Sequence, residues 1–341
     1  MTVLYVAGTE SGVGKTALTG ALAFHAKKLG RRVALFKPFF SAQEAADVHH
    51  DCDAEFYTQM SDVPLPNGWP IHLASGNATA YSDIEERLLR TVDDLANGGT
   101  TVIVEGLDIS ESDQNSIEWS ATIVEKLAAD VLLSGRHGLS KARPSLDKIS
   151  SVFGARLKGV VLNKIPPHSS LEIANRLVPA MYTDGYKLVA MIPEDRRMLS
   201  PTVGQVTSHL EADLIFEGDG TESLVEHVMV GGWFLDQGAY VFSRRKNKAV
   251  VVRGDRSDIQ MAALATSTSC LVLTAGMRPI QYVTYHAEQS QTPMLVVPYS
   301  TSEAMERLGS VRQSASVHHL AKIAHYADML STSCNTESLL G

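Results

Sequence analysis

Cysteine is scarce in this chain, and the placement of the few cysteines excludes two kinds of stabilisation. The 341 residues contain three, Cys52, Cys270 and Cys334, which lie far apart and form no CxxC pair. We therefore expect neither a disulfide framework nor a cysteine-rich zinc site. Long apolar runs are missing as well, since no stretch reaches the roughly eighteen apolar residues that a membrane span requires. The opening segment, MTVLYVAG, is typical of a strand and lacks the basic region and cleavage site of a secretion signal.

Positive charge is in deficit. Lys and Arg number 30 against 38 Asp and Glu, which gives a formal net charge of −8. This balance argues against a nucleic-acid partner held by general basicity. Hydrophobic residues make up 44% of the chain, which is ordinary globular usage, and the length favours two domains. We expect a cytoplasmic protein with two cores and with neither a nucleic-acid nor a membrane partner.

The strongest functional signal lies near the amino terminus. A β-branched run at residues 2–7 is followed by Gly-Thr-Glu-Ser-Gly-Val-Gly-Lys-Thr at 8–16 and by an alanine- and leucine-rich segment at 17–29. Strand, glycine-rich loop and helix together are the context of a phosphate-binding loop, whose backbone N–H groups surround phosphate oxygens. A plain glycine-rich turn would not explain the Lys-Thr pair. The predicted nucleotide contacts are Gly8, Thr9, Gly12, Val13, Gly14, Lys15 and Thr16. Lys15 is assigned to the terminal phosphates as a catalytic cation, and the Thr16 hydroxyl to Mg²⁺.

The loop departs from the strict G-x4-GK[ST] pattern, because Thr9 stands where that pattern places its first glycine. As a whole, residues 8–16 resemble the loop of dethiobiotin synthetases, G-T-D-T-x-V-G-K-T. Wider relatives are the amide-forming cobyrinic acid synthases and the N-terminal domain of long bacterial phosphotransacetylases. ParA/MinD-type ATPases normally carry a lysine where this chain has Glu10, so that similarity is weaker.

The dethiobiotin synthetase resemblance carries expectations about fold and chemistry. It implies an α/β fold of the P-loop NTPase type, with a mostly parallel sheet and helices on both faces. It also implies ATP and Mg²⁺ as cofactors, a small carboxylate or amine as substrate, and a homo-oligomer, namely a dimer.

Lysine and carboxylate candidates follow in the next part of the chain. The strand expected at residues 32–36 ends at Lys37, and a residue just past a strand end points into the crevice where ligands of open α/β sheets bind. The resemblance implies that Lys37 lies beside the reacting carbamate and phosphate as a second catalytic lysine, with Ser41 as a secondary contact. It also implies an aspartate ligand for Mg²⁺, best matched by Asp53 and less well by Asp51.

Two other interpretations of the acidic segment at residues 47–55 stay open. A histidine-based metal site is disfavoured because His49 and His50 are adjacent and would point apart. The acidic residues could instead form an ordinary helix N-terminus, where negative charge is favourable.

Further strands are expected at residues 101–104, 130–133, 159–162 and 188–192. Glu105 follows the first of them and is a candidate Mg²⁺ ligand. The related synthetases carry Glu-Gly-Ala-Gly-Gly here, whereas this chain has Leu107 and Asp108 after Glu-Gly, which puts a diaminopelargonate-like substrate in doubt. By resemblance, Asn163 contacts the adenine and Pro193 begins the loop that closes the purine pocket. The alternative for Asn163 is a turn residue at a strand end.

The pattern changes near residue 200, and we predict a nucleotide-binding domain at 1–200, a smaller α/β domain at 201–330 and a flexible tail at 331–341. Residues 254–264, Gly-Asp-Arg-Ser-Asp-Ile-Gln-Met-Ala-Ala-Leu, resemble the DRTGG domain, a regulatory module attached to the same P-loop domain in phosphotransacetylases. Asp255 and Arg256 are candidate contacts for a substrate or regulatory ligand. Alternatively, Asp255 or Ser257 only caps the following helix.

Two functions are compatible with these patterns. The first is an Mg-ATP-dependent enzyme, an ATPase or ligase that phosphorylates an unidentified acceptor. The second is a non-catalytic nucleotide-sensing protein that acts through the DRTGG-like domain. The intact Lys15-Thr16 pair and Lys37 favour the first, and the missing substrate glycines favour the second.

Overall fold

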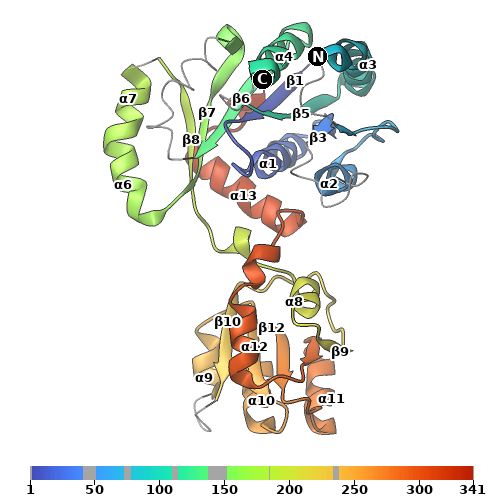
Figure 1. Cartoon of the computed structure of the whole chain (residues 1–341). Helices are drawn as coiled ribbons and strands as arrows, with labels where there is room; N and C mark the ends of the chain where they lie inside the picture. Colours follow the sequence, from blue (N-terminus) through green and yellow to red (C-terminus); the bar gives the residue numbers. More distant parts are fainter. Residues whose placement is uncertain are drawn as a thin grey trace. The chain divides into compact units, whose positions relative to one another are not determined.

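The computed structural model describes residues 2–40, 51–72, 78–109, 114–136, 152–183, 185–232 and 238–340 (Figure 1). The chain divides into two compact units, which we call unit 1 (Met1–Asp195 with His318–Gly341) and unit 2 (Arg196–Val317). Both are α/β, as the sequence predicted. Among the described residues, no helix combines the length and the apolar character needed to cross a membrane.

Unit 1 is built on a sheet in which all paired strands run parallel. The strands, in spatial order, are β2 (Val33–Phe36), β5 (Thr101–Asp108), β1 (Val3–Gly8), β6 (Asp130–Arg136), β7 (Leu157–Ile165) and β8 (Leu188–Pro193). Their near-continuous apolar runs suit strands that are buried on both faces. Because β1 lies between β5 and β6, the glycine-rich loop after β1 starts at the middle of the carboxyl edge of the sheet.

Helices cover both faces of this sheet (Figure 1). On one face, α3 (Ala78–Ala96) and α4 (Gln114–Lys126) bury apolar side chains against β1 and β5. On the other face, α1 (Lys15–Lys28) packs beside α13 (Leu320–Ser333). Unit 1 also contains α2 (Cys52–Met60), α6 (Ser170–Glu172), a π-helix (Ile173–Leu177), α7 (Val178–Thr183), α14 (Glu337–Leu340) and a small sheet of β3 (Phe39–Phe40) and β4 (Ile71–His72).

The carboxyl-terminal segment differs from its predicted assignment. We expected residues 318–330 in the second domain and a flexible tail at 331–341, but residues 318–340 pack in unit 1 and end in the short helix α14. Gly20 of α1 permits the close approach of α13, since a Cβ there would lie 2.9 Å from the Cδ1 of Ile323. Leu339 and Leu340 are buried. The apolar stripe of α13 therefore has its partner on α1, which the local sequence pattern does not identify.

Unit 2 contains a second, five-stranded sheet. The strands, in spatial order, are β10 (His227–Gly231), β11 (Lys248–Arg253), β12 (Thr268–Thr274), β13 (Met294–Val296) and the antiparallel edge strand β9 (Asp213–Phe216). The helices are α8 (Val203–His209), α9 (Gly238–Ser243), α10 (Ser257–Leu264), α11 (Gln281–Gln289) and α12 (Thr301–Leu308). Alternate residues of β11 and β12 belong to two core clusters, one with α8 and α12 and one with α9, α10 and α11. Both faces of the sheet are thus covered.

Candidate nucleotide site

The glycine-rich loop has the backbone geometry of an anion-binding loop. It joins the end of β1 at Gly8 to the start of α1 at Lys15. Gly12 and Gly14 have φ angles of +70° and +94°, in the left-handed region that favours glycine. In the described part of the chain, no side chain caps the first turn of α1. The N–H groups of that turn therefore suit an anion as their partner.

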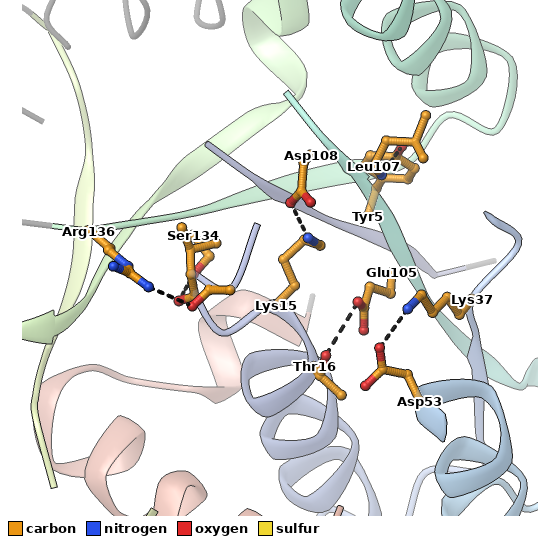
Figure 2. A network of polar contacts seen from close by, with 12 residues as sticks. Tyr5, Lys15, Thr16, Lys37, Asp53, Glu105, Leu107, Asp108, Ser134 and Arg136 are labelled. Atoms are coloured by element: carbon orange, nitrogen blue, oxygen red, sulfur yellow. Dashed lines mark hydrogen bonds and ion pairs between the residues drawn. The ribbon is translucent and has the colours of Figure 1, made fainter. Parts of the chain in front are cut away.

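Side chains from the ends of β6 and β7 hold the carbonyl groups of this loop. The Asn163 amide donates to the Val13 oxygen at 2.8 Å, and the Lys164 ammonium donates to the Gly12 oxygen at 2.8 Å. Two longer hydrogen bonds add to these: Arg136 donates to the Gly12 oxygen at 3.4 Å, and Ser134 donates to the Val13 oxygen at 3.3 Å (Figure 2). With its carbonyl groups engaged in this way, the loop is held from the side of β6 and β7.

Lys15 forms an ion pair with Asp108, the last residue of β5 (Figure 2). The lysine is buried, and the Ile109 N–H donates to the Gly8 oxygen at 2.7 Å, which ties the end of β5 to the start of the loop. Asp108 therefore supplies the negative charge beside Lys15 that a phosphate would bring. In the sequence, Asp108 stands out only as a departure from the related synthetases, and no role is predicted for it.

A second group of charges gathers beside the first turn of α1. The Thr16 hydroxyl lies 3.4 Å from the Glu105 carboxylate, and the Lys37 ammonium lies 2.6 Å from Asp53 (Figure 2). The Lys37 ammonium also lies 3.0 Å from Asp51. The Tyr57 hydroxyl donates to the other Glu105 oxygen. These residues come from β5, α1 and α2, from the position after β2 and from the N-cap of α2. The fold thus brings together the lysine, hydroxyl and carboxylates that the sequence singled out.

The pKa values of two carboxylates in this group, Glu105 and Asp53, are displaced in opposite directions. Burial raises the pKa of Glu105 to about 7, with a further contribution from the negative charge of Asp53. Burial also acts to raise the pKa of Asp53, but the hydrogen bond from His318 and the charge of Lys37 outweigh it and hold that pKa well below its usual range. Tyr57 is buried beside Glu105, and both burial and that negative charge raise its pKa.

The donor set fits Mg²⁺. Mg²⁺ takes one or two carboxylates together with phosphate oxygens and water, and here the Thr16 hydroxyl adjoins the buried Glu105 carboxylate with Asp53 near. A cation would relieve the repulsion between these carboxylates. Among the described residues, no group of three or more His, Cys, Asp or Glu side chains is arranged to hold a metal. We therefore expect Mg²⁺ to bind here only together with phosphate, which would supply the ligands that the protein does not.

Other predicted site residues have different surroundings. Asn163 is buried and contacts the loop backbone, while its predicted contact with adenine stays a prediction. Pro193 is the exposed last residue of β8, at the same edge of the sheet. Ser41, like His49 and His50, lies outside the described residues.

Asp255 and Arg256 lie in unit 2, in the loop between β11 and α10. Within the described chain, α10 begins without the side-chain cap expected from Asp255 or Ser257, because Arg256 occupies the N-cap position. Asp255 in this loop and Asp258 in the first turn of α10 are instead paired with arginines two residues away, Arg253–Asp255 at 2.8 Å and Arg256–Asp258 at 2.9 Å.

Two family models match the chain, and the boundary between them lies close to the point where the chain passes from unit 1 to unit 2. The sequence model of a family described as "AAA domain" matches residues 2–202, and that of the "DRTGG domain" matches residues 205–311. The two regions therefore correspond to a P-loop domain similar to dethiobiotin synthetases followed by a DRTGG domain.

Individual proteins match either the whole chain or one part of it. Phosphate acetyltransferase of Synechocystis sp. is 23% identical over 99% of this chain and 51% of its own length. ATP-dependent dethiobiotin synthetase BioD of Mycobacterium avium is 32% identical over 52% of this chain and 81% of its own length. Among solved structures, the MinC:MinD cell division protein complex of Aquifex aeolicus matches 58% of this chain and 84% of its own, with 16% identity and a TM-score of 0.40. The chain spans about half the length of the phosphate acetyltransferases it matches.

Proposed function

This chain belongs to the AAA domain family, and from that premise we propose that unit 1 binds ATP with Mg²⁺ and hydrolyses it slowly, with an acceptor pocket beside Lys37. One observation carries the proposal. The glycine-rich loop, Lys15, Thr16, Lys37 and Glu105 meet at the carboxyl edge of one parallel sheet, where ligands of such folds bind.

Each residue of the site has a role that follows from its charge and its position. The N–H groups at the start of α1 bind the phosphates, and Lys15 leaves Asp108 to pair with the terminal phosphate. Thr16, Glu105 and Asp53 would hold Mg²⁺, which would supply positive charge against the phosphates. Lys37 then stabilises charge that develops on the transferred phosphoryl group, so that positioning and electrostatics supply most of the rate enhancement.

A pocket beside Lys37 favours an enzyme with a second substrate. It has a volume of about 340 Å³, the size of a small-molecule site, and its walls include Lys37, Asp51, Glu55, Leu65 and Trp69. A cation and two carboxylates over an apolar wall suit an acceptor that carries an amine or a carboxylate.

The ion pair between Lys15 and Asp108 favours a second candidate function, nucleotide sensing through unit 2. A carboxylate that must leave the lysine before phosphate binds makes the empty and the loaded site different in charge. In that function the DRTGG domain carries the output, and Asp255 and Arg256 stay our candidates for its ligand. Phosphate release that amine or carboxylate acceptors stimulate in a single turnover would favour the enzyme. A nucleotide-dependent change in assembly would favour the sensor.

The nucleotide site itself is tested by titrating the protein with ATP and Mg²⁺ in a calorimeter. We expect Lys15→Ala to weaken binding by up to about 100-fold, the value of a charge-assisted contact of about 3 kcal/mol. Lys28→Ala, which removes an exposed lysine of the same helix, is the control and should bind as the unchanged protein does. Equal affinity in all three proteins would reject the site.

A further inference from the structure

Asp53 is held from two directions by residues far apart in the chain. Its Oδ2 lies 2.6 Å from the Lys37 ammonium, and its Oδ1 lies 2.6 Å from the Nε2 of His318, which is 265 residues away in sequence. The His318 ring also packs against the ring of Phe56, with centroids 5.6 Å apart. The carboxylate is therefore fixed by both of its oxygens, and the imidazole that fixes it is itself fixed by an aromatic side chain.

The backbone that presents His318 is anchored as well. The next residue, His319, accepts a hydrogen bond from the Ala321 N–H at 3.1 Å and so caps α13. That helix packs along α1, the helix of the phosphate-binding loop, where His25 bonds the Ala327 oxygen at 2.8 Å. The contact between His318 and Asp53 is thus part of a built interface and not a loose surface pair.

His318 also has a particular place along the chain. Unit 2 ends at Val317, so His318 is the first residue of the segment that returns to unit 1. The segment that enters unit 2 also starts beside α13, since Asp195, the last residue before it, lies 3.0 Å from the Nε2 of His325. Of these two histidine–aspartate pairs, only the pair made by His318 includes Asp53, which also contacts Lys37.

We propose that His318 is a positioning residue of the nucleotide site, which orients Asp53 toward Lys37 and Mg²⁺ and couples that site to the chain that leaves unit 2. This inference rests on the proposed function, because it assigns a role in Mg-ATP binding. Without the imidazole, the Asp53 carboxylate can rotate away from the position set by Lys37. By reciprocity, nucleotide that orders Asp53 also restrains the segment around Val317.

The first test compares ATP affinity with and without Mg²⁺ in His318→Ala, His318→Gln and His325→Ala. We expect His318→Ala to lower the Mg²⁺-dependent gain in affinity by about 10-fold, the usual effect of removing a group that orients a metal ligand, and to leave ATP binding in EDTA unchanged. His318→Gln keeps an N–H donor and should retain part of the gain. His325→Ala removes the matched pair at Asp195 and should behave as the unchanged protein.

The second test uses hydrogen exchange and the unchanged protein, so it does not depend on the fold of a variant. We expect saturating Mg-ATP to slow exchange in residues 309–317, and the imidazole ¹⁵N resonances of His318 to shift. An unchanged Mg²⁺ dependence in His318→Ala, or the absence of both effects in the unchanged protein at saturation, would overturn the proposal. Failure of the proposed function is distinguishable, because the unchanged protein would then bind no ATP, or would bind it as tightly as Lys15→Ala.

Discussion

The two units place charged residues at the carboxyl ends of parallel strands, but they treat those charges differently. In unit 1, Lys15, Lys37 and Glu105 are almost inaccessible to solvent and meet partners from distant parts of the chain. In unit 2, the charges after β11 are exposed and pair with residues two positions away, such as Arg253 with Asp255. The same architecture thus carries a buried charge cluster in one unit and a solvated loop in the other.

This difference indicates which charged residues of the chain have a functional role. Removing charges from water costs free energy that their mutual attraction often fails to recover, so folding stability does not explain the cluster in unit 1. Buried groups with displaced pKa values mark candidate functional sites. Exposed ion pairs between near neighbours contribute little to stability. We therefore expect substitutions in the buried cluster to change activity and those in the exposed loop to change little.

The largest effect should come from Glu105→Gln, which keeps the shape of the side chain and removes its charge. Glutamine cannot supply the negative oxygen that Mg²⁺ requires beside Thr16, so we expect single-turnover hydrolysis of ATP to fall by about 100-fold. ATP affinity measured in EDTA should change by less than about threefold, since the phosphate contacts come from the loop. Glu86→Gln, at an exposed ion pair on α3, is the control. Hydrolysis at an unchanged rate in Glu105→Gln would show that the buried cluster is not catalytic.

Much of this cluster could be predicted because its members have local sequence signals. Lys37 and Glu105 each follow an apolar strand-like run, and parallel strands align their carboxyl ends at one edge. The glycine-rich loop has its own spacing signal. Fold class and the gathering of these residues were therefore accessible from the sequence.

Other members have no such signal. Tyr57 lies within a helix with no motif, and its contact with Glu105 depends on how α2 packs. His318 reaches Asp53 only because α13 returns to α1, a tertiary contact that the pattern of α13 alone does not specify. Asp108 was visible as a departure from the related synthetases, but its pairing with Lys15 depends on the register between β1 and β5.

A second prediction concerns Lys248, a buried lysine at the start of β11 in unit 2. Its ammonium donates to the Thr266 hydroxyl at 2.9 Å and the Ser267 oxygen at 2.7 Å, and burial lowers its pKa to about 8. Below that pH, the folded and unfolded chains both hold the proton. Between about pH 8 and 10.5 only the unfolded chain holds it, so the free energy of unfolding should rise with pH, by on the order of 2 kcal/mol.

Lys248→Met removes this titration, so the rise should be smaller in the variant than in the unchanged protein. Urea unfolding of the whole chain at several values between pH 7.5 and 10 measures the difference. Lys246→Met, a nearby exposed lysine, is the control and should keep the rise. An identical pH dependence in all proteins would mean that the buried lysine does not carry the penalty.

The smallest effect should come from Asp255→Asn in the exposed loop. Asp255 is bonded by the Arg253 guanidinium through two contacts, at 3.0 and 2.8 Å, but solvent screens both charges. We expect the melting temperature to change by less than about 2 °C, and Mg-ATP affinity in unit 1 to stay unchanged. Asn at this position keeps an oxygen that can accept from Arg253, so any larger effect would have to come from the charge itself. A shift of several degrees, or an altered nucleotide affinity, would mean that this loop carries a role comparable to the buried cluster. Exposure would then be a poor guide to function in this chain, because a solvated pair would matter as much as the charges that the fold has buried.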